Sequence, residues 1–220
     1  MTKRIITIDI ETLPMNEPMD SNLFWKDEEE FRETALDGAL GRILCIGYTE
    51  QSEFGKIVAH GCFGWNESTE KFEMDEAKML TEFWDYLKGF NLNKDLIIGH
   101  NILEFDLPFI KKRSLIHNVS PTVHFSFYRY QKEPIFDTML HFDSWFSGKN
   151  KTTSLKKLAY AFGLDCPKEI LGELNVYDAF LAGEYKLLHD YCKADVKAAH
   201  LIWRKLSAGQ KPIKSMALAG

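Results

Sequence analysis

The chain has 220 residues, of which 45% are apolar, and a formal net charge of −5. This length suits one domain with a substantial core, and the composition excludes disordered and fibrous chains. The sequence has no run of about 18 apolar residues, and its N-terminal segment turns acidic where a signal peptide would stay apolar. We therefore expect a cytoplasmic protein without a membrane span.

The hydrophobic pattern predicts strands first, then alternating strands and helices, and finally helices. The expected strands are 4–10, 42–50, 55–63, 95–99 and 134–137. A first expected helix begins after Asp75, which would cap it, and a second runs from Asp106 to about His117. Further helices are expected at 154–162, 175–182 and 184–206. This order favours an α/β fold with a mixed sheet in a single domain, 1–208. An acidic insert at about 14–41, with a short helix near 27–37, separates the first two strands, and a flexible tail follows at 209–220.

Two carboxylates stand at the end of the first strand. Asp9 and Glu11 are two residues apart, so their side chains point to the same face. Ionised carboxylates on a buried strand need a compensating cation, and oxygen ligands suit magnesium or manganese. An exposed acidic strand end would give the same pattern.

Two further acids could join this pair. Asp106 lies where strand 95–99 leads into a helix, and it could cap that helix or face a cleft at the strand ends. Tyr191 and Asp195 are spaced i and i+4 on an apolar face of the last helix, where the aspartate needs a metal or a basic partner. Carboxylates from several elements are what a pair of divalent cations requires in phosphoryl transfer.

Three motifs stand in order along the chain: Asp9-Ile10-Glu11-Thr12, Asn101-x-x-x-Phe105-Asp106 and Tyr191-x-x-x-Asp195. With them, the sequence from about residue 4 to 206 resembles the DEDD (DnaQ-like) superfamily of 3′–5′ exonucleases in its tyrosine (DEDDy) branch. The likeness is greatest to the proofreading exonuclease domain of family-B DNA polymerases and its stand-alone relatives. The sister branch has a histidine five residues before the last aspartate, where this chain has Asp190.

The resemblance implies a ribonuclease H-like fold, with a five-stranded mixed sheet flanked by helices. It implies that Asp9, Glu11, Asp106 and Asp195 are catalytic and bind two divalent cations, Mg²⁺ or Mn²⁺. Tyr191 would orient the attacking water, since a phenol is a poor base at neutral pH. The implied activity removes nucleotides from the 3′ end of single-stranded DNA or RNA and releases nucleoside 5′-monophosphates. No polymerase domain follows, so we expect no proofreading within this chain.

The resemblance also suggests contacts to the substrate strand. Thr12 and Leu13 would touch the terminal nucleotide, although Leu13 also suits the core. Phe105 would support a base or fill the core, and Asn101 would contact the strand or tie down its own loop. His100 fits a loop histidine better than a ligand, and Asp137 fits a helix cap before Thr138 better than a further metal ligand.

The charges are distributed unevenly. Residues 15–37 carry eight acids and two bases, whereas residues 111–157 carry nine bases and three acids. Basic residues interleaved with aromatic ones suit single-strand binding, although a core with lysine-coated helices has the same composition. We name as candidate substrate contacts Arg129, Tyr130, Lys149 and Lys151. The acidic insert could cover the site or repel a duplex.

Two other functions remain open. A catalytically inactive nucleic-acid-binding or scaffold module could share the fold, but such a module would not need all four acids and Tyr191. A ribonuclease H-like endonuclease does not fit the tyrosine motif. The four cysteines form no C-x-x-C pair, so we expect free thiols and no zinc site.

Overall fold

The computed structural model describes residues 2–15, 25–127, 133–143, 152–165 and 169–209. Four of the candidate substrate contacts, Arg129, Tyr130, Lys149 and Lys151, lie outside these ranges, as does nearly all of the expected tail. Within the described residues, none of the helices combines the length and the apolar character needed to cross a bilayer.

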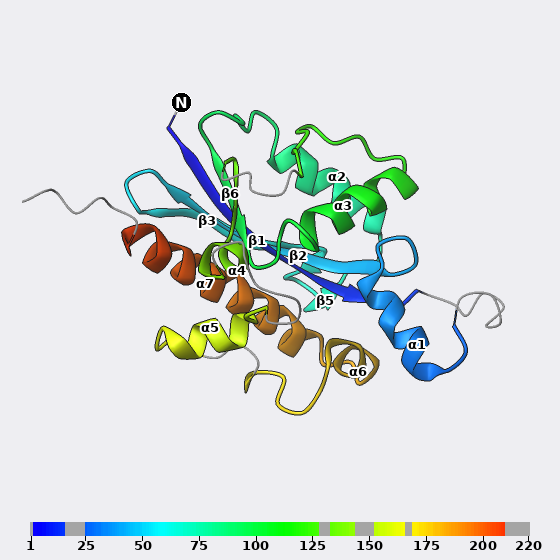
Figure 1. The fold of residues 1–220 in the computed structure, drawn as a ribbon. Helices are drawn as coiled ribbons and strands as arrows, with labels where there is room; N and C mark the ends of the chain where they lie inside the picture. Colours follow the sequence, from blue (N-terminus) through cyan, green and yellow to red (C-terminus); the bar gives the residue numbers. More distant parts are fainter. Residues whose placement is uncertain (1, 16–24, 128–132, 144–151, 166–168, 210–220) are drawn as a thin grey trace, which may run out of the picture.

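Five strands form one mixed sheet in the order β3-β2-β1-β6-β7 (Figure 1). β1 is antiparallel to β2 and β2 to β3, whereas β6 and β7 run parallel to β1. The bounds are β1 Arg4–Leu13, β2 Arg42–Ser52, β3 Ile57–Phe63, β6 Leu96–Gly99 and β7 Ile135–Asp137. The expected five-stranded mixed sheet is therefore confirmed. A second small sheet of β4 (Trp65–Asn66) and β5 (Lys71–Phe72) was not predicted, because two-residue strands carry no alternating pattern.

Helices cover both faces of the large sheet (Figure 1). On one face lie α2 (Glu76–Tyr86) and α3 (Asp106–Ile116). The long helix α7 (Tyr185–Gly209) crosses the other face. Three shorter helices pack against α7, namely α4 (Thr138–Phe142), α5 (Leu155–Ala161) and α6 (Val176–Leu181). The insert between β1 and β2 contains α1 (Glu28–Glu33) and the 3₁₀ turn η1 (Thr34–Leu36), as the sequence predicts.

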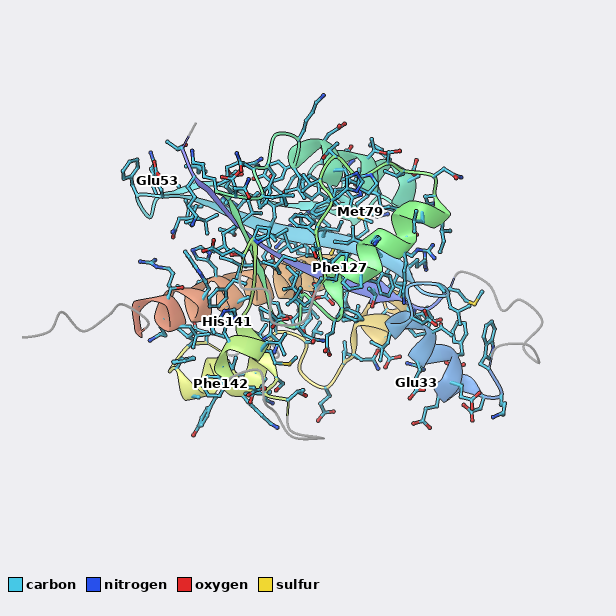
Figure 2. All side chains as sticks on the ribbon, turned by 45° about the horizontal axis from the view of Figure 1, so that its top comes forward. Glu33, Glu53, Met79, Phe127, His141 and Phe142 are labelled. Atoms are coloured by element: carbon cyan, nitrogen blue, oxygen red, sulfur yellow. The ribbon has the colours of Figure 1, made fainter. Side chains whose placement is uncertain are left out.

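The alternation along β1 determines which side chains face α7. Ile6, Ile8 and Ile10 pack into the core that includes residues of α2 and α3. Thr7 points the other way, where its hydroxyl hydrogen-bonds His200 Nδ1 of α7 at 2.9 Å. Figure 2 shows side chains filling both layers, with the buried Met79 on the α2 side. The odd-numbered residues of β1 therefore face α7.

Polar side chains fix where several helices begin. Asp75 caps α2 and accepts from the Lys78 main-chain N–H at 2.9 Å, as expected. Asp137 caps α4 and accepts from the main-chain N–H groups of Met139 and Leu140 at 3.0 and 3.2 Å. Asp137 thus has the capping position that the sequence favours.

Candidate active site

Asp9 and Glu11 lie where β1 extends beyond its parallel neighbour β6. The last residue of β1 that pairs with β6 is Thr7, opposite Ile98, so the strand continues beyond its parallel neighbour. Asp9 and Glu11 lie in this extension, on the face that α7 covers. Glu11 is only 6% exposed and Asp9 is partly buried. One buried and one partly buried carboxylate therefore lie near the end of β1.

A glycine lets α7 approach this strand end closely. Gly47 of β2 pairs with Asp9 across the sheet. A Cβ at Gly47 would lie 2.6 Å from Cys192 Sγ and 2.9 Å from Val196 Cγ2, both on α7. Any larger residue would push α7 away from β2. The helix can thus bring Asp195 and Tyr191 over the carboxylates of β1.

Asp106 joins the same place from the start of α3. Its Oδ1 atom accepts a hydrogen bond from the Ile10 main-chain N–H at 3.1 Å. The N-cap position of α3 is Phe105, so Asp106 is the first residue of the helix and not its cap. The side chain is 3% exposed. Asp106 therefore supports the end of β1 and adds a third buried carboxylate beside Asp9 and Glu11.

The electrostatics show that the four acids form one cluster. Burial, with the charges of Asp195, Asp106 and Glu11, raises the pKa of Asp9 well above its ordinary value. The pKa of Glu11 is raised in the same way, by burial and by Cys192, Asp195 and Asp106. Burial also raises the pKa of Asp106 to about 7, despite the Ile10 hydrogen bond that favours the ionised form. No salt bridge within the described ranges involves Asp9, Glu11 or Asp106.

This donor set fits divalent cations. Buried carboxylates that repel one another and have no salt-bridge partner are costly unless a cation compensates them. Asp195, also buried at 8% exposure, adds to the charge on Asp9, Glu11 and Asp106. An all-oxygen set of this kind suits the hard cations Mg²⁺ and Mn²⁺.

Tyr191 faces the acids, whereas its two predecessors on α7 do not. Burial and the charges of Asp195 and Glu11 raise the pKa of Tyr191 further above its ordinary value. The hydroxyl therefore stays protonated and donates a hydrogen bond. The His189 ring stacks on Trp65 with the ring centroids 4.3 Å apart. Asp190 pairs with the exposed Lys186 one helical turn away.

A cleft of about 470 Å³ opens beside Glu11. Thr12 and Phe105 line it with Glu11, and Phe105 also packs against the core and against Phe109, at 5.5 Å between ring centroids. The other lining residues are Ile10, Glu29, Arg32, Glu33, Ala35, Leu36, Asn175, Val176 and Tyr177. The cleft can thus hold a group adjacent to the carboxylates.

The acidic insert forms the far wall of this cleft together with α6. Arg32 Nη1 lies 2.6 Å from Asp178 Oδ1, and the guanidinium lies 5.1 Å from the centre of the Tyr177 ring. Phe31 also contacts Tyr177, with 6.1 Å between ring centroids. The sequence did not indicate these wall residues, because no local pattern links the insert to α6.

Leu13, Asn101 and His100, which lie in or beside the motifs, each have a different environment. Leu13 is fully buried in the core with Leu44 and Leu188, so only its main chain could reach a nucleotide. Asn101 has a left-handed backbone with φ of 60°, and its Oδ1 is buried without a hydrogen-bond partner among the described residues. The Nδ1 atom of His100 hydrogen-bonds the Thr138 hydroxyl at 3.0 Å, as a loop histidine would.

Some residues of the basic stretch 111–157 stabilise the fold. Arg113 is buried and donates two hydrogen bonds to Glu76, at 2.9 and 2.8 Å. Phe125 and Phe127 pack against the main core. These residues are therefore structural, and any substrate contact within this stretch falls to its other members.

The sheet and its helices define an α/β domain of the ribonuclease H-like class. The chain belongs to a family described as predicted 3′–5′ exonucleases related to the exonuclease domain of PolB, whose model matches residues 36–218. This membership places the chain among the 3′–5′ exonuclease hydrolases and confirms the resemblance to the DEDD superfamily. The match begins after Asp9 and Glu11, so their assignment depends on the first motif and on the geometry.

Solved structures agree on the fold. The chain is similar to Escherichia coli Exonuclease I in complex with a dA16 oligonucleotide, at a TM-score of 0.54 and 13% identity. It is also similar to the same enzyme with a 5cy-dT13 oligonucleotide, at a TM-score of 0.51 and 12% identity. Each match covers 96% of this chain and 41% of Exonuclease I, so the chain spans about two fifths of that protein. No curated relative matches the chain.

Proposed function

We propose that the chain is a metal-dependent 3′–5′ exonuclease of the tyrosine branch. It acts on single-stranded nucleic acid in the cytoplasm and releases nucleoside 5′-monophosphates. The observation that carries this proposal is the meeting of Asp9, Glu11, Asp106 and Asp195 in one buried cluster whose charges raise the pKa values of its members.

The four acids would hold two divalent cations, Mg²⁺ or Mn²⁺. When bound, such cations lower the pKa of a water molecule and stabilise the charge that develops on the phosphate. The protein supplies the negative charge that attracts them. The Ile10 N–H fixes one oxygen of Asp106 and leaves the other for a cation.

Tyr191 would orient the attacking water. A phenol whose pKa is raised does not remove a proton at neutral pH, so the residue acts through the hydrogen bond that it donates. The outward position of Asp190 and the stacking of His189 on Trp65 support the tyrosine branch over the histidine branch.

The cleft beside Glu11 would hold the terminal nucleotide. Thr12 and the Leu13 main chain would contact its sugar or base, and the Phe105 ring lies where it could support the base. Asn101, the first residue of the second motif, would contact the substrate strand.

The single-strand preference draws on two observations. The similar Exonuclease I structures contain dT13 and dA16 oligonucleotides. In the sequence, Arg129, Tyr130, Lys149 and Lys151 would provide charge and one stacking ring for such a strand. Glu29 and Glu33 in the cleft wall add negative charge that disfavours a second phosphate backbone beside the site.

The test uses 5′-labelled single-stranded DNA and RNA with Mg²⁺ or Mn²⁺. We expect a ladder that shortens from the 3′ end, stops with a chelator, and is absent for Asp195→Asn purified in the same way. Internal cuts from the first time point would indicate an endonuclease. Binding without cleavage on both nucleic acids and with both metals would indicate an inactive module.

A further inference from the structure

Three cysteines that are far apart in the sequence lie together in the fold. Cys45 belongs to β2, Cys62 to β3 and Cys192 to α7. Their Sγ atoms all lie within 4.8 Å of one another. None of the three is in a disulfide bond, and the spacing of the cysteines gave no sign that they meet.

The sheet register explains this meeting. Cys62 pairs with Gly47 across β2 and β3, and Cys45 lies two residues from Gly47 on the same strand, so both thiols point to the α7 face. Gly47 has no side chain, and Cys192 of α7 fills the space above it. The three sulfur atoms thus surround one glycine.

The surroundings suit a bound cation. Cys45 and Cys192 are fully buried, while Cys62 is partly exposed. Zinc–thiolate bonds of about 2.3 Å in a tetrahedral site place sulfur atoms roughly 3.8 Å apart, a spacing that small side-chain movements would give here.

We propose that Cys45, Cys62 and Cys192 form a binding site for one thiophilic divalent cation such as Zn²⁺, distinct from the carboxylate site. Thiolates select zinc over Mg²⁺ and Mn²⁺, whereas the carboxylates favour the harder cations. Three protein ligands leave a fourth tetrahedral position for water.

The thiol site and the carboxylate site are adjacent, with Cys192 between them. Cys192 Sγ also lies within 4.8 Å of carboxylate oxygens of Asp9 and Glu11. A zinc ion held by the thiols adds positive charge there and engages the helix turn that carries Tyr191. Occupancy of the thiol site therefore slows the exonuclease, a consequence that rests on the proposed function.

The test titrates the full chain with Co²⁺ under a reductant that contains no thiol. We expect one Co²⁺ per chain with a thiolate-to-cobalt charge-transfer band in the near ultraviolet and tetrahedral bands in the visible, all removed by Zn²⁺. Co²⁺ held only by carboxylates gives no charge-transfer band, so the spectrum separates the two sites. A folded wild-type protein without that band would overturn the proposal.

Variants locate the site. Cys62→Ser, at the partly exposed position, should keep the fold and weaken Co²⁺ binding by at least about tenfold, since even outer-shell changes have that effect at metal sites. The matched control is Cys166→Ser, outside the described residues, which should bind as wild type. Equal spectra for Cys62→Ser and wild type would contradict the assignment.

A second readout addresses inhibition. With Mg²⁺ in excess, Zn²⁺ equimolar with the protein should slow the wild type more than Cys62→Ser. Equal inhibition of both would contradict the coupling between the sites. A chain that binds Co²⁺ through thiolates but cleaves no nucleic acid would refute the proposed function and leave the thiol site standing.

Discussion

The carboxylate of Asp106 accepts a hydrogen bond from the Ile10 main-chain N–H, with 3.1 Å between Oδ1 and N. This bond joins the second motif to the first at the point where β1 has passed its parallel neighbour β6. It satisfies a buried donor and places a third carboxylate beside Asp9 and Glu11.

Two substitutions of Asp106 separate its charge from its hydrogen bond to Ile10. Asp106→Asn keeps an oxygen acceptor for Ile10 but loses the charge, so we expect normal folding and a loss of activity of about 10²–10³-fold, comparable to the loss of other groups that stabilise transition-state charge. Compared with Asp106→Asn, Asp106→Ala should lower the free energy of unfolding by about 1–3 kcal/mol, because the Ile10 N–H loses its partner. Denaturant unfolding and single-turnover rates measure both effects, and full activity of Asp106→Asn would exclude a metal role.

Tyr191→Phe tests the donor role of the hydroxyl. We expect Mn²⁺ binding to persist and the turnover rate to fall by about 10²-fold, within the range for losing one hydrogen-bond donor at a reaction centre. Because the pKa of Tyr191 is raised further, its ionisation should add no limb to the pH–rate profile below pH 10. A tyrosine-dependent limb near neutral pH would show that the phenol acts as a base.

The acid cluster should make metal binding depend on pH. The pKa of Asp106 is raised to about 7, so protons compete with cations below that pH. Mn²⁺ affinity should rise as the pH increases through about 7, and calorimetry in buffers of different ionisation enthalpy should detect released protons. An affinity that is constant from pH 6 to 8 would contradict this cause.

Repulsion among the buried carboxylates should destabilise the metal-free protein. A carboxyl whose pKa is raised on folding makes the free energy of unfolding fall as pH rises from its unfolded value toward its folded value. Asp9→Asn removes one such carboxylate, so it should raise the metal-free free energy of unfolding at pH 8 above that of the wild type. Saturating Mn²⁺ should stabilise the wild type more than this variant.

The cleft wall offers a test of nucleotide positioning. Arg32→Ala breaks the link from α1 to Asp178 of α6, while leaving the four acids untouched. We expect KM for single-stranded DNA to rise several-fold with kcat and Mn²⁺ binding unchanged. Lys78→Ala, which removes an exposed ion pair on α2, is the matched control. Equal KM values for both variants would mean that the wall does not contact the substrate.

Much of the fold could be predicted from the sequence because its strands are long or strongly apolar. The β-branched run from Arg4 and the Asp75 cap each produced a confirmed element. The β4–β5 pair and the register shift between Glu11 and Thr12 were not predicted, because tertiary packing and not local pattern creates them.

Some residues of the candidate site could likewise be predicted from the sequence, and others could not. The motif acids and Tyr191 were named from the sequence because each stands on a recognisable element at fixed spacing. Arg32 and Asp178 are 146 residues apart, and their contact appears only when α1 packs on α6. The meeting of Cys45, Cys62 and Cys192 also needs the register of β2 with β3, which no spacing in the chain specifies.

The measurement that tests the central claim most directly is calorimetric titration of the full chain with Mn²⁺ at pH 8. The account predicts two bound ions per chain in the wild type and a loss of at least one in Asp195→Asn, with Cys62→Ser unchanged. No Mn²⁺ binding, or equal binding by the wild type and Asp195→Asn, would contradict the claim that these four acids hold the catalytic cations.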